Sequence, residues 1–299
     1  MSIWLRKFLT CGLGASLLAL SGGGLWKSGL PSSAARSTDP LHYTVNIRTD
    51  FFAAAAVGFN LADVSSQFAL DALPPGMEGV YWVGNGYKRE CSWKIPDDQL
   101  TIIVEAIKDH PKFSGMYFIA DTPHPSVCPD GPERIAERTA LIHSLDPMAK
   151  TFIVVVEGWH YPGEFAQLKD AADYIGVDPY PCNVTNAESG CSWDKLRTRV
   201  ANAIAGGIAV NRIVPVFQAF GQDCTEAKKP YYRLPTIAET RTLLALWDEL
   251  IPAAQRPFDM TYSWGSQPLH SCPSLQMANG DAYPDLQSVY ARYFTEMGH

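Results

Sequence analysis

Short apolar runs alternate with longer amphipathic stretches along most of the chain. The apolar runs have the length and the β-branched content of strands, and most are apolar throughout, as expected when both faces of a sheet are covered. Runs of this kind lie at residues 55–61, 79–83, 115–120, 151–156, 174–177, 212–219 and 259–263. The amphipathic stretches predict helices at residues 62–73, 97–110, 131–145, 162–172, 192–209, 235–251 and 284–297. This order predicts βαβ units and a parallel sheet.

The predicted fold is an α/β fold, a single-domain (β/α)8 TIM-like barrel. Such a barrel needs eight strands, so one more is expected, either at residues 42–48 or in a short piece after Cys272. An open doubly wound sheet is the alternative, and it usually carries a Gly-rich phosphate turn. Because the chain has no G-x-G-x-x-G motif, we favour the barrel. A chain of 299 residues with 46% hydrophobic content is long enough for one large core.

The first 35 residues predict an export signal. A positively charged pair precedes an apolar run at residues 8–20, which is short for a membrane span. Small-residue cleavage sites follow Ser21 and Ala35. We expect residues 36–299 to form the mature domain, without stable insertion in a membrane. An uncleaved N-terminal anchor is the alternative.

The net charge and the cysteine content limit the classes of partner and the cellular compartment that we expect for this protein. The formal net charge is −7, which argues against nucleic acid or an anionic membrane as a partner, because both favour clustered Lys and Arg. One cysteine, Cys11, lies in the signal, and the other six predict three disulfides in a secreted or extracytoplasmic protein. There is no C-x-x-C pair and no Cys/His cluster at zinc-ligand spacing. We therefore expect no bound metal.

The predicted barrel places its binding site where the strands end. Polar, acidic and aromatic residues concentrate after nearly every predicted strand, and so do the cysteines. The side chains singled out by this position are Asn60, Asp63, Asp121, His124, Glu157, Trp159, Asp178, Tyr180, Gln218 and Trp264. Six cysteines allow fifteen pairings, but the barrel brings particular loops together. It predicts the disulfides Cys91–Cys128, Cys182–Cys191 and Cys224–Cys272.

A cleft that combines carboxylates with aromatic rings indicates a carbohydrate ligand and requires no cofactor. Carboxylates serve as acid, base or nucleophile at a glycosidic bond, and aromatic rings stack on the apolar faces of sugars. We predict three catalytic candidates, Asp121, Glu157 and Asp178, although Asp178 equally fits a rigid Asp-Pro-Tyr-Pro turn. The predicted substrate-binding residues are Asn60, Asp63, His124, Trp159, Tyr180, Gln218 and Trp264.

Several stretches resemble TIM-barrel glycoside hydrolases. Residues 117–123 (YFIADTP) are similar to the strand followed by D-E-P or N-E-P in that superfamily, and residues 175–181, 214–221 and 261–264 are similar to later strands. The resemblance implies a (β/α)8 barrel that hydrolyses O-glycosyl bonds in a polysaccharide or glycoconjugate. In the large retaining clan, a Glu after strand four is the acid/base and a Glu on strand seven is the nucleophile.

The chain departs from that clan at both positions. If residues 42–48 form the first strand, the two glutamates fall on Thr122 and Gln218, neither of which can do their chemistry, while the clan's last-strand Trp falls on Trp264. A hydrolase would then use other carboxylates. Asp121 and Glu157 lie on adjacent strands, where a separation of about 5 Å, as in retaining enzymes, is possible. Asp121 and Asp178 are two strands apart, nearer the ~6.5–9.5 Å of inverting enzymes.

Other functions stay open at this point. A non-catalytic carbohydrate-binding barrel at the cell surface explains the two missing glutamates. A metal-dependent hydrolase would use His124, His160 and either Asp63 or Asp178, and a structural envelope protein would bind no small ligand. For each of these functions we expect a monomer.

Overall fold

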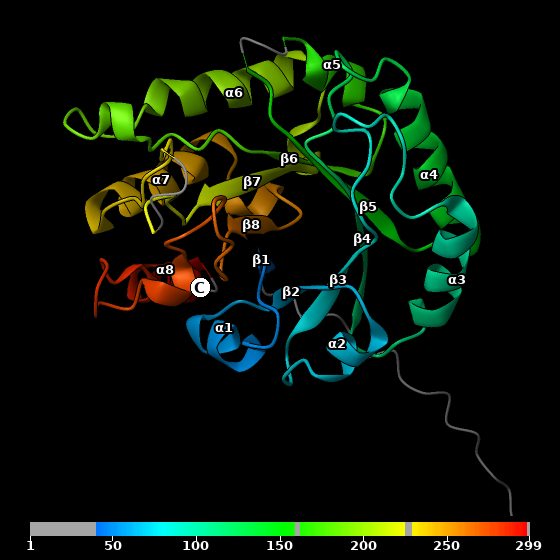
Figure 1. Ribbon diagram of the computed structural model, residues 1–299, viewed down its shortest axis with the longest axis horizontal. Helices are drawn as coiled ribbons and strands as arrows, with labels where there is room; N and C mark the ends of the chain where they lie inside the picture. The colour runs from blue at the N-terminus through cyan, green and yellow to red at the C-terminus, as the bar shows by residue number, and fades with distance from the viewer. Residues whose placement is uncertain (1–39, 159–161, 225–228, 298–299) are drawn as a thin grey trace, which may run out of the picture. The chain divides into compact units, whose positions relative to one another are not determined.

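The computed structural model describes residues 40–158, 162–224 and 229–297. The predicted export signal, Trp159 and His160 lie outside the described residues. Eight parallel strands form a closed barrel in sequence order, and β1 pairs with β8 to complete the ring. Figure 1 shows this ring of strands with the helices around it. The predicted fold class is confirmed.

The strands that form the barrel are short, and they carry the labels of Figure 1. They are β1 (His42–Thr44), β2 (Leu61–Val64), β3 (Glu78–Trp82), β4 (Phe113–Asp121), β5 (Lys150–Val155), β6 (Tyr174–Val177), β7 (Ile213–Gln218) and β8 (Asp259–Tyr262). The strand that the sequence left open is therefore the one within residues 42–48.

The helices alternate with the strands and cover the outside of the ring. They are α1 (Phe51–Val57), α2 (Gln67–Asp71), α3 (Asp97–Ile107), α4 (Gly131–Leu145), α5 (Glu164–Leu168), α6 (Trp193–Ala205), α7 (Ile237–Leu250) and α8 (Leu286–Met297). Four short 3-10 helices lie in the connections, at Val184–Asn186, Val210–Arg212, Ala253–Gln255 and Leu275–Met277. No helix of the described ranges is both long and apolar enough to cross a bilayer.

The predicted strand at residues 55–61 is wrong. Residues 55–57 belong to helix α1, because the four consecutive alanines at residues 53–56 favour a helix more strongly than their apolar character favours a strand. Gly58, with φ at 110°, ends the helix in the left-handed conformation that glycine adopts readily. Strand β2 then starts at Leu61, so the predicted helix at residues 62–73 is reduced to α2.

This shift moves Asn60 to the opposite end of the barrel. Asn60 precedes β2 instead of following a strand, and its Oδ1 accepts a hydrogen bond from the backbone N of His42, where β1 begins. Its Nδ2 donates to the carbonyl of Pro40. The expectation that Asn60 lies on the face where the strands end is therefore wrong.

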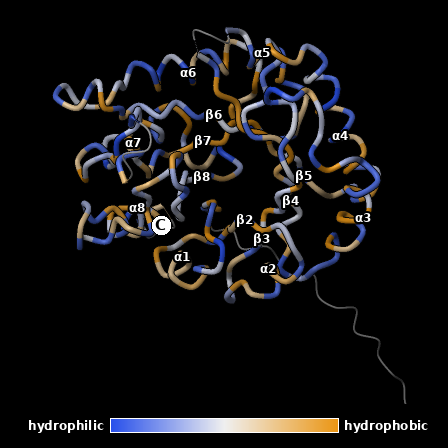
Figure 2. Tube along the Cα trace, in the orientation of Figure 1, coloured by the Kyte–Doolittle hydropathy of each residue, from blue (hydrophilic) through white to orange (hydrophobic). Residues whose placement is uncertain are grey.

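The core has two parts. Side chains inside the barrel form one cluster, which includes Leu61, Val80, Phe152 and Met260, and a larger cluster fills the space between the strands and the helices. Because both faces of each strand are covered, the strands are apolar throughout. In Figure 2, β5 to β7 are drawn largely in the hydrophobic colour, whereas the helices alternate between hydrophobic and hydrophilic turns.

The three predicted disulfides are present. Cys91 pairs with Cys128, Cys182 with Cys191, and Cys224 with Cys272. All six cysteines lie in loops that follow strands. The cross-links therefore tie together the loops on the face where β3, β4, β6, β7 and β8 end.

Candidate functional site

A cavity of about 260 Å³ lies on the barrel axis, at the carboxyl ends of the strands. The residues that line it are Tyr43, Val45, Asn46, Asp63, Trp82, Phe118, Asp121, Val154, Tyr180, Met260, Tyr262 and Gln267. A larger surface hollow of about 610 Å³ lies between α7 and α8, outside the barrel. Sites in barrels of this kind form at the strand ends, and we therefore take the axial cavity as the candidate site.

The alternation of side chains along each strand explains how the cavity is built. Every second residue of a strand points to the same face. Leu61, Val80 and Met260 belong to the cluster inside the barrel. Two residues further along the same strands come Asp63, Trp82 and Tyr262, all of which line the cavity. The inward rows thus change from apolar to polar or aromatic where the barrel opens.

Asp121 reaches the cavity through an irregularity in β4. The pairing of β4 with β5 shifts register between Phe118 and Ala120, after which Asp121 lies opposite Val154, another residue of the cavity wall. Such bulges redirect the side chains that follow them. The carboxylate stays 42% exposed, and its Oδ2 lies 4.0 Å from Nζ of Lys88. Loss of solvent raises the pKa of Asp121, while the charges of Lys88 and His124 oppose the rise.

Asp63 is the second carboxylate of the cavity. The backbone N–H groups of Asn46 and Ile47 donate to its two oxygens, at 2.9 Å and 3.2 Å. Burial raises the pKa of Asp63, and these donors oppose the rise because they stabilise the charged form. The same bonds fix the loop between β1 and α1. Asp63 therefore lies in the cavity, as expected for a substrate-binding residue.

Asp178 lies just behind the cavity wall. Asp178 is only 3% exposed, and its Oδ1 has no hydrogen-bond partner among the described residues. Burial raises the pKa of Asp178 well above the ordinary value, the charge of Asp121 raises it further, and Arg199 opposes the rise. Two residues earlier on β6, a Cβ on Gly176 would lie 2.9 Å from Val154, so only glycine fits there.

Aromatic rings form the rim beside Asp178. Tyr180 lines the cavity, and its ring centroid lies 5.0 Å from Phe220, 5.5 Å from Tyr232 and 5.8 Å from Tyr262. Burial, followed by the charge of Asp121, raises the pKa of Tyr262 to about 12. Burial also raises the pKa of Tyr180. Tyr180 and Tyr262, two of the three tyrosines of the cavity wall, therefore keep their protons at neutral pH and can donate hydrogen bonds.

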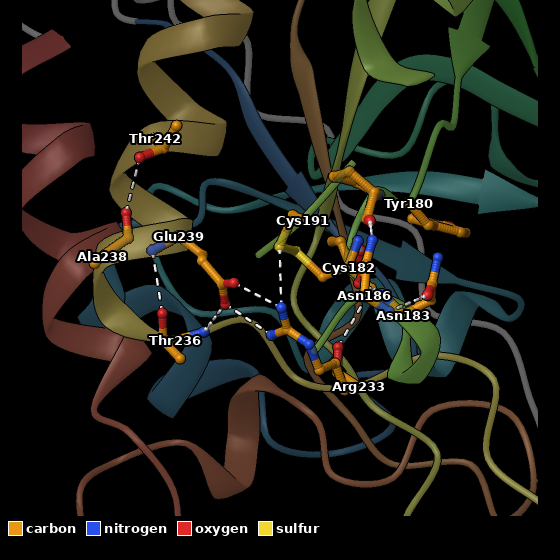
Figure 3. The surroundings of a disulfide bond; sticks show 12 residues. Tyr180, Cys182, Asn183, Asn186, Cys191, Arg233, Thr236, Ala238, Glu239 and Thr242 are labelled. Atoms are coloured by element: carbon orange, nitrogen blue, oxygen red, sulfur yellow. Dashed lines mark hydrogen bonds and ion pairs between the residues drawn. A yellow bond between two sulfur atoms is a disulfide. The ribbon is translucent and has the colours of Figure 1, made fainter. Parts of the chain in front are cut away.

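The loop that carries Tyr180 is held from several sides, as Figure 3 shows. The Cys182–Cys191 disulfide closes it, and Nζ of Lys195 donates to the carbonyl of Tyr180 at 3.2 Å. Beside the disulfide, Arg233 forms a two-point ion pair with Glu239, at 2.6 Å and 2.7 Å. These contacts tie the Tyr180 loop to α6 and place it beside the ion pair at the start of α7.

Cys182, Cys191 and Glu239 are the one grouping of potential metal-ligand atoms in the described parts of the chain. The two sulfurs are joined to each other and the carboxylate is paired with Arg233. The grouping therefore serves the loop and does not present free ligands.

Glu157, a predicted catalytic residue, does not line the cavity. Its Oε2 accepts a hydrogen bond from the backbone N of Phe165 at 3.0 Å, in the first turn of α5. Its Oε1 accepts from Nδ2 of Asn202 in α6, also at 3.0 Å. Asp121 and Glu157 come from adjacent strands, but only Asp121 faces the cavity. This arrangement gives Glu157 the contacts of a residue that joins two helices.

Three predicted substrate-binding residues also lie outside the cavity wall. Nδ1 of His124 lies 3.2 Å from the buried carboxylate of Glu164. The indole of Trp264 is buried and donates from Nε1 to Asp50 at 2.9 Å. Gln218 is fully buried, and its amide bonds the backbone of Cys182.

Other cavity residues were not among the predicted set. Tyr43 and Asn46 belong to the run at residues 42–48, whose position was left open, and Trp82 reads as core packing. The alternating direction of side chains along a strand would have identified them, but it can be applied only when the bounds of the strand are known. Gln267 follows β8 in a loop, where alternation gives no guidance.

Comparison with known proteins agrees with the fold. No protein-family model matches the chain, and no curated protein sequence matches it. Among solved structures, a glycoside hydrolase family 18 N-acetylglucosaminidase from Paenibacillus barengoltzii is similar, with a TM-score of 0.52, 10% identity, and coverage of 85% of this chain and 99% of that one. A structure described as a glycoside hydrolase-like protein is also similar. Its TM-score is 0.53 at 12% identity, over 87% of this chain and 94% of that one.

A third similar structure is a β-glucuronidase from Ruminococcus gnavus. Its TM-score is 0.56 at 12% identity, over 86% of this chain and 50% of that one. The chain thus spans half the length of that enzyme. The similarity to all three structures shows that this chain shares their barrel fold.

Proposed function

We propose that the protein is an exported glycoside hydrolase in which Asp121 gives a proton to the glycosidic oxygen of a polysaccharide or glycoconjugate. The observation that carries the proposal is the composition of the axial cavity. Of the residues that the structure describes, two carboxylates and three tyrosines line it, and no basic side chain does. Glycoside hydrolysis passes through a transition state in which the sugar ring becomes positively charged. An anionic wall stabilises that charge.

The surroundings of the carboxylates support a division of roles. A proton donor needs a raised pKa and access to the substrate. Asp121 has both, because burial raises its pKa and its side chain is partly exposed. Asp63 is held by two N–H donors that favour its charged form, which suits the stabilisation of a cationic ring. Asp178 lies behind Asp121 as a buried neighbour.

Two features support export. The three disulfides are typical of proteins in oxidising compartments, and the first 35 residues have the pattern of a signal peptide. We therefore propose that the enzyme acts outside the cytoplasm, as a monomer.

A non-catalytic carbohydrate-binding barrel is the second candidate. It is favoured by Thr122 and Gln218, which stand where the large retaining clan carries its glutamates. The backbone of Thr122 donates to Val154 at 2.8 Å, and Gln218 bonds the Cys182 backbone. The Gln218 side chain thus holds the loops, whereas the Thr122 bond is made by its backbone. A binding protein would keep the cavity and release no sugar.

The test is a screen for released sugars. The full chain, produced for export so that its disulfides form, is incubated with a panel of bacterial and plant polysaccharides, and new reducing ends are followed. Release that disappears in Asp121→Asn supports the hydrolase. Binding to one glycan without release, at equal strength in both proteins, supports the binding barrel instead.

A further inference from the structure

We propose that the axial cavity, which is open at the strand ends and ends blindly on the packed barrel interior, is a subsite for a single uncharged sugar residue at the non-reducing end of a glycan. The inference rests on the proposed carbohydrate function and deepens it by naming the substrate class. An enzyme with such a site removes one terminal sugar at a time and does not cut within a chain.

The size of the cavity fits one sugar ring. Its volume of about 260 Å³ lies below the ~300–1,000 Å³ of pockets that hold drug-sized ligands. A single hexose is smaller than such ligands, whereas a disaccharide is not. The interior of the barrel beneath the cavity is filled by the packed cluster that includes Leu61, Val80 and Phe152. A glycan therefore cannot pass through the cavity.

The position of Asp121 sets the direction of the sugar. Its carboxylate is partly exposed, whereas Tyr43, on the same cavity wall, is fully buried. A proton donor must reach the glycosidic oxygen at C1, so C1 points toward the exposed carboxylate. The other ring positions then face the closed interior. This orientation leaves no exit for sugars attached at those positions, which is why the bound residue is a non-reducing end.

One wall of the cavity is a connected set of polar groups. Nε2 of Gln267 donates to Oδ1 of Asn46 at 2.6 Å, and the backbone N of Asn46 donates to Asp63. The side chains of Asp63, Tyr262 and Gln267 line the cavity and are partly exposed, so their polar atoms are within reach of a ligand. The hydroxyl groups of a sugar would pair with these atoms.

The opposite side of the cavity is apolar. Trp82, Phe118 and Val154 line it, and such a surface suits the C–H face of a pyranose. The combination of a hydrogen-bonding wall and an aromatic wall is the one expected around a single neutral sugar.

Charge excludes acidic sugars. Among the described residues, Asp63 and Asp121 are the carboxyl groups that line the cavity, and no Lys, Arg or His lines it. A uronic acid would bring a third carboxyl group into the cavity, where like charges repel strongly. Lys88 is beside Asp121 but does not line the cavity. We therefore infer that the terminal sugar is neutral.

The experiment combines three measurements on the full, disulfide-bonded chain. Binding is measured for neutral oligosaccharides with a fluorescent tag at the reducing end, and for the same oligosaccharides with an ethylidene group blocking the non-reducing end. Product lengths are followed on untreated oligosaccharides. Paired aryl glycosides that differ only in a C6 carboxylate, such as glucoside and glucuronide or galactoside and galacturonide, are compared for binding and release.

If the cavity is such a subsite, oligosaccharides with a free non-reducing end should bind, and those with a blocked non-reducing end should not. The subsite also predicts a monosaccharide as the first product, and at least tenfold weaker use of each uronic acid than of its neutral counterpart. Products of several lengths from the start, equal binding of blocked chains, or preference for a uronic acid would overturn it. Binding of an open neutral end without any release supports the subsite and overturns only the hydrolase. Absence of both binding and release overturns both.

A pair of tyrosine variants provides the matched control. Tyr262 lines the cavity with a partly exposed side chain, whereas Tyr117 is fully buried and does not line it. Tyr262→Phe should weaken glycan binding about tenfold, and Tyr117→Phe should change neither binding nor thermal stability. Equal binding by Tyr262→Phe and the wild-type protein would contradict the assignment of the cavity wall.

Discussion

The side chain of Gln218 satisfies both backbone polar groups of Cys182. Oε1 accepts from the Cys182 N at 2.9 Å, and Nε2 donates to the Cys182 carbonyl at 2.8 Å. Nε2 also bonds the carbonyl of Arg233 at 3.1 Å. The end of β7 therefore carries an amide that ties together the loops after β6 and β7. A glutamate at this position would lack the donor on which the arrangement depends.

Gln218→Glu, which restores the glutamate of the retaining clan, should destabilise the protein without improving hydrolysis. The new carboxylate is fully buried and faces two carbonyls, so the free energy of unfolding should fall by about 3 kcal/mol. Urea unfolding measures the change. Gln255→Glu, at an exposed position at the other end of the barrel, serves as control and should leave stability unchanged. A gain in turnover with unchanged stability would refute this explanation.

Glu157→Gln should affect stability and leave chemistry intact. The substitution replaces one acceptor oxygen by a donor, which costs one of the hydrogen bonds to Phe165 N or Asn202. We expect a loss of about 1–2 kcal/mol in unfolding free energy and unchanged kcat/KM on the best substrate. A large loss of kcat with unchanged stability would instead indicate that Glu157 is a catalytic residue.

Asp178→Asn should stabilise the protein at neutral pH. The pKa of Asp178 is raised in the folded state. Its carboxyl therefore adds to the free energy of unfolding below the unfolded-state pKa of about 3.9, and this contribution decreases as the pH rises toward the folded-state pKa. Asparagine does not ionise and avoids that loss, which amounts to about 1.4 kcal/mol for each unit of the rise. Unfolding curves from pH 3 to 8 should show the variant gaining over the wild-type protein with pH. Parallel curves would contradict the raised pKa.

The disulfides should differ in what they contribute. In the chain-entropy relation, loops of 9 and 48 residues correspond to about 2.6 and 4 kcal/mol. Replacing both Cys224 and Cys272 by Ala should therefore cost more stability than replacing Cys182 and Cys191. The second pair should cost more glycan affinity, because it holds the Tyr180 loop. Thermal melts and binding titrations on the two double variants measure the two effects. If one variant lost more of both stability and glycan affinity than the other, the prediction would be contradicted.

The sequence predicts the barrel well because apolar runs alternate with amphipathic stretches at a regular spacing, which indicates a parallel sheet. The disulfides expected from that barrel are all present. The failure at residues 55–61 has a local cause, since an alanine run is apolar but strongly helical. That one error displaced Asn60 by the length of the barrel.

The candidate site was predicted less completely than the fold. Asp121 and Tyr180 could be placed at the cavity because each ends or follows a clear strand, whereas Asp63 was placed there from the wrongly predicted strand at residues 55–61 and lies within β2. The direction of a side chain depends on register, and a bulge in β4 decides it for Asp121. Gln218 and Glu157 also stand at strand ends, but their polar atoms bond neighbouring loops. Sequence position does not separate a residue that serves the ligand from one that serves the scaffold.

The proton-donor role of Asp121 is tested most directly by varying the leaving group. For Asp121→Asn and the wild-type protein, kcat/KM is measured on a dinitrophenyl glycoside, which departs without protonation, and on a natural oligosaccharide, which does not. Loss of general acid catalysis should lower kcat/KM by about 10²–10⁴ on the oligosaccharide and only slightly on the dinitrophenyl glycoside. Equal losses on both substrates, or no loss on either, would contradict the role of Asp121 as the acid.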